Sequence, residues 1–520
     1  MKRIGIDVGG TNTDAVIVDR GRVVRSVKSP TTPDVTSGIV AAIRKLSGPS
    51  DSIADADAVM VGTTHFVNAV VQRKHLSQVA AIRIGLPATR GVPPFSDWPR
   101  ELIGPVKGGA WMIEGGHDYD GRKFMPLDLR EVHEVAREIR ARGLRYIAVS
   151  AMFSPLDSSD ETRVADILRN EIPGAEVICS HSIGGIGLLE RENATILNAS
   201  LMELAQTTVQ SFERAKEEIG ISAPLYITQN DGTVAEAARA AAFPVFSFAS
   251  GPTNSMRGAA YLSKLQDALV VDVGGTSSDF GFLRAGFPRE ANTVVKIGDV
   301  RTLFRMPDLI SIGLGGGSLV DPNSMTIGPV SVGYRLMDEA LVFGGSQLTA
   351  TDIGVAAGLL DVGDKSRVAR LKPDLVRGVL KRAKATFEDY LDRMKPDAGD
   401  VTLIAVGGGA FLVPEHLEGA SRVVHVEHGN CANAVGAAIA QVSGEVDQIF
   451  QNVSRTEAIA AARQLANARA VEAGAGLDTL NLVEADDVPI AYLPGNAIRV
   501  RVKVVGDVRA NEPAHQKIPA

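Results

Sequence analysis

The stretch IGIDVGGTNTDAVIVDRG, residues 4–21, recurs later in the chain as LVVDVGGTSSDFGFLRAG, residues 269–286. When the two stretches are aligned, Asp7 coincides with Asp272, and the following two glycines, the threonine and a second aspartate also match. A repeat whose copies lie so far apart is not the short period of a solenoid. It indicates two related domains within one polypeptide.

Both copies have the residue pattern of two strands joined by a tight turn. An apolar, β-branched run precedes the Gly-Gly-Thr turn, and a second apolar run follows it. In the first copy a third strand, a helix over 35–46 and a buried strand over 58–61 come next. The pattern predicts an α/β protein with two duplicated lobes, each containing a mixed sheet that opens with an antiparallel meander.

Helix and strand patterns also alternate in the rest of the chain. Helices are predicted over 159–170, 190–218 and 455–473, and a final strand over 497–504. Residues 91–124 contain several Pro and Gly and are predicted to form an irregular insertion or lid.

These elements divide the chain into five segments. They are lobe I with the first repeat (1–90), an insertion with the remainder of lobe I (91–190), a connecting helical and strand segment (191–265), lobe II with the second repeat and a later glycine-rich loop (266–445), and a C-terminal helix and strand extension (446–520).

The composition is that of a globular protein that does not bind nucleic acid or an anionic membrane. The formal net charge is -7, and 45% of the residues are hydrophobic. A basic surface is the electrostatic requirement for polyanion binding, and the chain has no long basic run. No apolar stretch is long enough to cross a bilayer, and the N-terminal residues lack a signal sequence. We therefore expect a cytoplasmic protein.

Cysteine and histidine give little indication of further chemistry. The two cysteines, Cys179 and Cys431, exclude a disulfide framework and are expected to be buried thiols. His425 and His428 flank Glu427, but this spacing is more often found in surface or core histidines than in a metal site.

The Asp-x-Gly-Gly-Thr turn is typical of a phosphate-binding loop. Adjacent glycines after a strand let the backbone approach an anion, so that N–H groups and Thr or Ser hydroxyls donate to phosphate oxygens. Asp7 and Asp272 stand at the ends of their strands and are candidate ligands for Mg²⁺ or a metal-bound water. A single such turn is also compatible with a plain hairpin, but its presence in both copies favours the phosphate loop.

The two loops resemble those of the sugar kinase, Hsp70 and actin-like ATPase superfamily. Its members carry a phosphate loop in each lobe and a glycine-rich adenosine loop late in the chain, where Gly407-Gly408-Gly409 stands here. The resemblance implies an actin-like ATPase fold with ATP and Mg²⁺ in the cleft between the lobes. The candidate nucleotide-binding residues are Gly9, Gly10, Thr11, Asn12, Thr13, Gly274, Gly275, Thr276, Ser277, Ser278, Gly315, Gly316, Gly407, Gly408 and Gly409.

The chain resembles the hydantoinase A/5-oxoprolinase family more closely still. That family's opening motif matches Asp7–Asp14, its S-G-P block Ser250–Pro252, its second loop Asp272–Asp279, and its G-x-G-G-G-S run Gly313–Ser318. The resemblance covers nearly the whole chain, in the short A-subunit form. It implies an ATP-dependent hydrolase of a cyclic amide that works with a second hydantoinase-type subunit. The residues of the Gly313–Ser318 run are compatible with two roles. One is contact with phosphate or substrate, and the other is a turn that crosses between domains.

The family's H-G-T-T segment corresponds here to Val61-Gly62-Thr63-Thr64, and His65 follows it. Because Val61 replaces the first histidine, the role of that histidine is not carried over to this chain. Thr63, Thr64 and His65 are the substrate-side candidates.

The resemblance implies that ATP phosphorylates the amide oxygen and that water then opens the activated ring. Asp7 and Asp272 are assigned to Mg²⁺ and phosphate, and Asp14 or Asp279 to orienting the reacting groups, which makes these four the candidate catalytic residues. A small-molecule kinase and a substrate-activating carboxylase subunit on the same fold are the alternatives. A non-metabolic ATPase switch fits less well, since no peptide-binding domain is recognisable. The oligomeric state, a homo-oligomer included, stays open.

Overall fold

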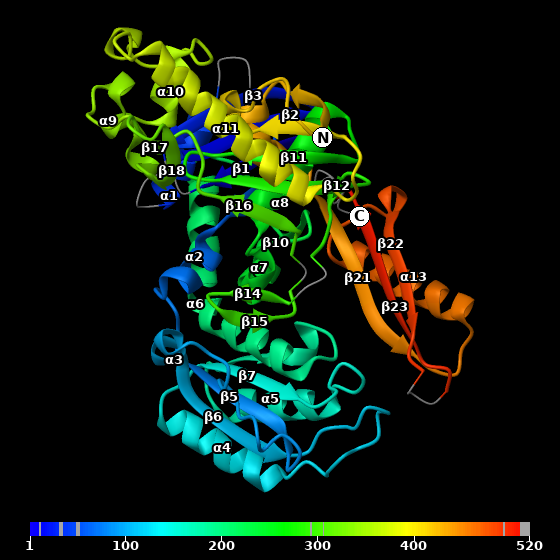
Figure 1. The fold of residues 1–520 in the computed structure, drawn as a ribbon. Helices are drawn as coiled ribbons and strands as arrows, with labels where there is room; N and C mark the ends of the chain where they lie inside the picture. Colours follow the sequence, from blue (N-terminus) through cyan, green and yellow to red (C-terminus); the bar gives the residue numbers. More distant parts are fainter. Residues whose placement is uncertain are drawn as a thin grey trace, which may run out of the picture.

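A computed structural model describes residues 1–9, 12–30, 35–47, 53–291, 294–304, 306–491 and 495–509. Two sheets lie near one another at one end of the molecule, and a third lies at the opposite end (Figure 1). The C-terminal strands project to one side as an extension of the first sheet (Figure 1).

The first repeat forms the centre of a nine-stranded sheet with the order β22-β23-β21-β10-β9-β4-β1-β2-β3. Its strands are β1 (Lys2–Val8), β2 (Asn12–Asp19), β3 (Arg22–Pro30), β4 (Ala58–Thr63), β9 (Leu225–Thr228), β10 (Thr233–Glu236), β21 (Gln441–Phe450), β22 (Asn481–Pro489) and β23 (Ile498–Gly506). Ile4 and Ile6 of β1 pack with residues of α1 (Val35–Leu46) and α6 (Leu188–Glu218) in one buried cluster.

The second repeat forms the centre of a six-stranded sheet with the order β13-β12-β11-β19-β20, to which β16 adds by pairing with β12. Its strands are β11 (Ala268–Val273), β12 (Ser278–Arg284), β13 (Phe287–Pro288), β16 (Leu309–Ile312), β19 (Val401–Val406) and β20 (Ala420–His425). Phe280 of this sheet packs with Phe387 and Leu391 of α11 (Pro373–Met394).

The two sheets repeat one topology. β1 pairs antiparallel with β2 and parallel with β4, whereas β11 pairs antiparallel with β12 and parallel with β19. The predicted α/β class, with two duplicated lobes that each open a mixed sheet by a hairpin, is therefore confirmed. The predicted helices over 35–46, 159–170, 190–218 and 455–473 are confirmed as well.

A separate four-stranded parallel sheet has the order β6-β5-β7-β8. It consists of β5 (Val79–Leu86), β6 (Lys107–Glu114), β7 (Tyr146–Ala151) and β8 (Glu176–Cys179), and residues of α4 (Leu129–Ala141) and α5 (Ser159–Glu171) pack in its core. The prediction that residues 91–124 are irregular is wrong for residues 100–114, which form α3 (Arg100–Val106) and β6. Pairing with the buried strand β5 outweighs the weak strand propensity of a sequence with two glycines.

The C-terminal residues extend the first sheet rather than the second. β21 and β23 pair antiparallel, β22 adds at the edge, and four alanines of α13 (Arg455–Glu472) pack against them. The predicted helix and last strand are present, while β21 and β22 were not expected. The five segment boundaries remain a prediction, but β21 crosses the one placed at residue 445.

The remaining elements connect these sheets or flank them. They are α2 (His65–Gln72), α7 (Ala237–Ala242), α8 (Ser250–Ser263), β14 (Val295–Ile297), β15 (Val300–Thr302), β17 (Ser318–Asp321), β18 (Thr326–Ser331), α9 (Leu336–Glu339), α10 (Ala350–Ala356) and α12 (Ala432–Ala438). No helix in the described ranges is both long and apolar enough to span a bilayer.

Helices α8 and α12 pack backbone to backbone, and α8 contacts strands of both large sheets. A Cβ atom added to Gly258 of α8 would lie 2.0 Å from Ala432 O, and one on Gly436 of α12 would lie 1.8 Å from Asn254 O. Likewise, a Cβ atom added to Gly5 of β1 would lie 2.1 Å from Ala434 O. The three glycines thus allow the close packing that brings the start of α8 to the strand ends of both lobes.

Candidate functional site

The two repeated hairpins close with the same hydrogen bond. Gly9 N donates to Asn12 O at 3.0 Å in the first, and Gly274 N donates to Ser277 O at 2.8 Å in the second. A Cβ atom would stand 3.0 Å from Asn12 O at Gly9 and 3.3 Å from Ser277 O at Gly274, so a side chain would press on each turn. The predicted residues Gly10 and Thr11 lie outside the described residues.

Each hairpin carries two aspartates in direct cross-strand register, Asp7 with Asp14 and Asp272 with Asp279. Burial, followed by the charge of Asp14, raises the pKa of Asp7 to about 7. Burial, followed by the charge of Asp279, raises the pKa of Asp272 to about 6, and the Ser255 hydroxyl offsets part of this rise. The sequence-predicted aspartates of each lobe therefore lie together, buried in the first hairpin and partly buried in the second.

The aspartates of the two lobes also interact with each other. The charge of Asp272 raises the pKa of Asp7, and the charge of Asp14 raises that of Asp272. Carboxylate oxygens are the ligands that Mg²⁺ prefers, and a divalent cation would relieve the repulsion between them. Asp7 and Asp272 suit Mg²⁺ by their chemistry and are the residues that would hold it, although the aspartates do not form a group of three ligand atoms within 4.8 Å of one another.

Lys28 is a cation of this site that sequence reasoning missed. It stands opposite Asp14 on β3, and its Nζ donates to the Asp14 carboxylate oxygens at 2.5 and 2.6 Å. Its charge also lowers the pKa of both Asp7 and Asp272. One lysine of the first lobe therefore acts on the carboxylates of both repeats.

Helices α8 and α12 add amides beside Asp7. Asn433 Nδ2 donates to Asp7 Oδ2 at 3.3 Å, and Asn254 Nδ2 donates to Thr228 Oγ1 at 3.0 Å. Gly62 lies between these groups, since a Cβ atom there would be 2.5 Å from Asn254 Nδ2 and 2.8 Å from Asp7 Oδ1. Sequence reasoning missed both asparagines, although the S-G-P block that opens α8 was a signal for this helix.

The predicted phosphate-binding hydroxyls differ in their surroundings. Thr13 Oγ1 is buried and has no hydrogen-bond partner among the described residues, as is also true of Asn254 Oδ1. Buried polar atoms without partners in a folded protein call for a ligand, a water or another explanation. Ser278 Oγ, by contrast, donates to Leu314 O at 2.5 Å and so supports the neighbouring loop.

Both later glycine runs pack on the second hairpin. Gly316 N donates to Gly274 O at 2.9 Å and Gly317 N to Gly275 O at 2.7 Å, so these two N–H groups brace the loop. Gly409 N donates to Val273 O at 2.7 Å. A Cβ atom on Gly407 would lie 2.3 Å from Asp272 Oδ1, whereas one on Gly408 would meet no atom within 4 Å among the described residues.

The substrate-side candidates stand at the end of β4, next to Asp7. Thr63 Oγ1 lies 2.6 Å from His65 Nδ1, and Ser250 Oγ of α8 donates to Thr63 O at 3.1 Å. Thr64 accepts from Asn68 Nδ2 at 3.2 Å. Burial lowers the pKa of His65, so the imidazole is neutral at pH 7. The structure brings the end of β4 and the S-G-P block together, and what these residues bind remains a prediction.

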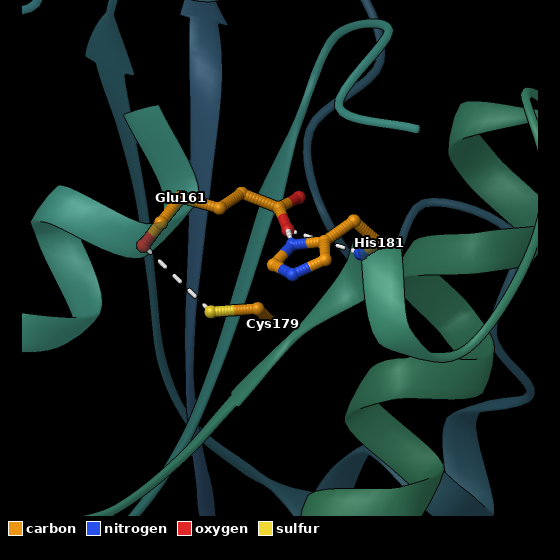
Figure 2. A group of neighbouring side chains, drawn as sticks. All are labelled: Glu161, Cys179 and His181. Carbon is orange, nitrogen blue, oxygen red and sulfur yellow. Dashed lines mark hydrogen bonds and ion pairs between the residues drawn. The ribbon is translucent and has the colours of Figure 1, made fainter. Parts of the chain in front are cut away.

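A second cluster of chemically active side chains lies at the carboxyl end of β8 (Figure 2). His181 Nδ1 lies 2.6 Å from Glu161 Oε2, and Cys179 Sγ donates to the Glu161 backbone carbonyl at 3.7 Å. The Glu161 carboxylate also accepts from Ser180 Oγ, His181 N and Ala151 N. Burial raises the pKa of the Cys179 thiol to about 12, so it stays protonated. In the metal-free protein the Glu161 oxygens are thus occupied by donors of the chain itself, and the Cys179 thiol is protonated.

Elsewhere in the described part of the chain no further group of three such residues has metal-binding geometry. His428 Nδ1 lies 3.4 Å from Ser26 Oγ. Cys179 and Cys431 are free, buried thiols, which confirms that prediction.

Known protein families and known proteins match most of the chain. Residues 3–172 match the model of the hydantoinase/oxoprolinase N-terminal region, and residues 191–366 match that of hydantoinase/oxoprolinase. The caprolactamase subunit alpha of Pseudomonas jessenii is 26% identical over 400 residues, which are 69% of this chain and 55% of that protein. The acetophenone carboxylase gamma subunit of Aromatoleum aromaticum is 27% identical over 471 residues, 82% of this chain and 61% of that protein. The chain therefore spans little more than half the length of these curated relatives.

A solved structure shows the same fold. The ATP-dependent caprolactamase from Pseudomonas jessenii superposes with a TM-score of 0.74 at 20% identity, over 98% of this chain and 88% of that one.

Proposed function

Since the chain belongs to the hydantoinase/oxoprolinase family, we propose that it uses ATP to phosphorylate the carbonyl oxygen of a cyclic amide, which water then opens. The observation that carries this proposal is the pair of facing hairpins, each with two aspartates, whose charges act on one another. Two phosphate loops from two lobes suit a ligand with several phosphate groups better than a single anion.

The chain's own residues have separate roles in this proposal. The turns at Gly9 and Gly274 bind phosphate oxygens through backbone N–H groups. Asp7 and Asp272 would hold Mg²⁺, which when bound would stabilise the charge on the transferred phosphoryl group. His65 at the end of β4 faces the substrate, and its neutral imidazole suits hydrogen bonding to an amide better than binding to an anion.

The chemistry follows from the low reactivity of an unstrained amide. Its carbonyl oxygen attacks the γ-phosphorus, and the bond from that phosphorus to ADP breaks. The resulting imidate phosphate has an electrophilic carbon and a good leaving group. Water adds to this carbon, and the carbon–nitrogen bond breaks to open the ring and leave an acyl phosphate. A second water attacks the acyl carbon, and phosphate departs with the former carbonyl oxygen.

A carboxylase subunit is the second candidate, because the acetophenone carboxylase gamma subunit matches a larger share of the chain than the caprolactamase subunit does. In that function the same hairpins would phosphorylate the oxygen of a ketone, and carbon dioxide or bicarbonate would replace water as the reaction partner. Both relatives are subunits by name, so a partner subunit belongs to either proposal.

An oxygen label distinguishes these functions. A cyclic amide such as caprolactam, hydantoin or 5-oxoproline, labelled with ¹⁸O at its carbonyl, is incubated with ATP, Mg²⁺, the chain and any co-encoded subunit. The proposal expects one labelled oxygen in inorganic phosphate for each ring opened. Ring opening with unlabelled phosphate would contradict the mechanism.

The other outcomes identify the alternatives. A stable phosphorylated product without phosphate release indicates a small-molecule kinase. ATP hydrolysis that depends on acetophenone or acetone together with bicarbonate, and on no amide, indicates the carboxylase. Asp272→Asn serves as the control for contaminating phosphatases, since it removes a phosphate-side carboxylate from this chain alone.

A further inference from the structure

Lys28 forms an ion pair whose geometry is set by the sheet. Asp14 and Lys28 are partners in the register of β2 and β3, and Nζ donates to the Asp14 carboxylate oxygens at 2.5 and 2.6 Å. The Asp14 side chain is only 11% exposed to solvent, whereas the Lys28 side chain is 34% exposed. The carboxylate is therefore fixed, whereas the long lysine side chain has room to turn.

The charge balance around this pair is unequal. Asp7, Asp14 and Asp272 interact through their charges, and Lys28 is the cation that acts on all three. A nucleoside triphosphate in the same site adds further negative charge beside these carboxylates. Mg²⁺ offsets part of that charge, but the last phosphoryl group still needs a mobile cation as its charge develops.

We propose that Lys28 changes partners when ATP binds, leaving Asp14 for the terminal phosphoryl group, so that it detects the γ-phosphate. The inference rests on the proposed function, because it requires a nucleotide triphosphate between the two hairpins. In this proposal Lys28 contacts the transferred phosphoryl group. Asp14 binds the Lys28 side chain between turnovers.

A purely structural ion pair is the alternative explanation. An ion pair between neighbouring strands whose lysine is partly exposed contributes only about 0–1 kcal/mol to stability. In that case, loss of Lys28 would lower the unfolding temperature a little and would weaken the binding of di- and triphosphate nucleotides equally. The two explanations therefore differ in one measurable quantity, the preference for triphosphate over diphosphate.

The test measures the dissociation constants of AMP-PNP and ADP, each with Mg²⁺, by calorimetry on the full chain without substrate. For Lys28→Met we expect the preference for AMP-PNP over ADP to fall about tenfold, the loss of one charge-assisted hydrogen bond, with ADP affinity nearly unchanged. Asp14→Asn should raise the preference, because Lys28 is then no longer held. The double variant Lys28→Met/Asp14→Asn should behave like Lys28→Met, since both act through one interaction.

Lys45→Met is the matched control. Lys45 is a neighbouring lysine whose Nζ donates to Ser29 Oγ at 3.0 Å and is not paired with a described carboxylate of the hairpins. Lys28→Arg keeps the positive charge and should retain most of the preference for AMP-PNP over ADP. It provides a second test of the proposal if Lys28→Met fails to fold.

The outcomes distinguish failure of the proposed function from failure of the Lys28 partner change. A wild-type chain that binds neither nucleotide would contradict the proposed function and this inference with it. A wild-type chain that prefers AMP-PNP, with the same preference in Lys28→Met, would contradict the partner change alone. An Asp14→Asn variant that loses the preference would show that Asp14 itself, rather than Lys28, recognises the γ-phosphate.

Discussion

Asp7 lies directly opposite Asp14 across the first hairpin, so that two buried carboxylates form one cross-strand pair. Like charges directly opposite each other destabilise a sheet. The second hairpin nevertheless repeats the arrangement with Asp272 and Asp279. A feature that costs stability twice, at the same position of both repeats, indicates selection for a cationic ligand rather than for folding.

The first prediction concerns the strand-end aspartates. Asp7→Asn and Asp272→Asn should each lower kcat for ATP turnover by about 100-fold or more, because each removes a charge that acts on the reacting phosphate. Asp19→Asn, at the opposite end of the first hairpin, is the control and should leave turnover unchanged. Steady-state kinetics at saturating ATP measure the effect, after circular dichroism has established that each variant is folded. Full activity in either strand-end variant would remove that residue from the site.

The second prediction concerns the contact between α8 and α12. Gly258→Ala should destabilise the protein by at least about 1–3 kcal/mol, because its Cβ atom would lie 2.0 Å from Ala432 O, which belongs to rigid backbone. Gly91→Ala, at an exposed turn, is the control, since no described atom lies within 4 Å of the new Cβ atom. It should be neutral or stabilising by up to about 1 kcal/mol. Urea unfolding of both variants measures the difference, and equal midpoints would refute the close packing.

The hairpins could be predicted from the sequence because their signals are local. Two strand patterns joined by a glycine pair need only neighbouring residues to be recognised, and the same holds for the long helix α6. The edge strand β22 escaped prediction because NLVEADDVP is acidic and has little strand propensity. The conformation of β22 is determined by its pairing with β23.

The ion pair of Lys28 with Asp14 illustrates what the sequence could not show. The register of β2 and β3 shifts at Ile17 and Val18. A shift of one residue moves every side chain of a strand to the other face, so the partner of Asp14 depends on this irregularity. Likewise, Asn254 reaches the site only through the packing of α8 on α12, which no local pattern encodes.

The third prediction concerns the cluster of Figure 2. Glu161→Gln should destabilise the protein by about 1–3 kcal/mol, because Ser180 and His181 lose a charged hydrogen-bond acceptor. Buried Arg191 also loses one of the two negative charges, those of Glu161 and Glu192, that stabilise its cation. Glu171→Gln is the control, since Glu171 pairs with His133 at an exposed position and should contribute less than about 1 kcal/mol. Neither variant should change the relative affinity for ATP and ADP. A change in that ratio in Glu161→Gln, in a folded protein, would connect this cluster to the nucleotide.

The last prediction follows from the pKa of Asp7, which burial and Asp14 raise from 3.8 to about 7. A carboxyl group with a raised pKa binds its proton more tightly in the folded state than in the unfolded state. Its favourable contribution to stability is therefore complete below about pH 4 and is lost as the pH rises to about 7. Since one pKa unit corresponds to about 1.4 kcal/mol, the loss is on the order of a few kcal/mol.

Asp7→Asn removes this titration and so isolates it from the other groups. The midpoint of thermal unfolding of Asp7→Asn, relative to that of wild type, should rise by several degrees between pH 5 and pH 8, in the absence of metal and nucleotide. Asp361→Asn, at an exposed position, should show no such rise. Added Mg²⁺ and AMP-PNP should reverse the order at pH 8, because the ligand binds the ionised aspartate of wild type and stabilises its folded state. A difference between variant and wild type that does not change with pH would mean that Asp7 is ionised throughout, and that neither burial nor Asp14 raises its pKa.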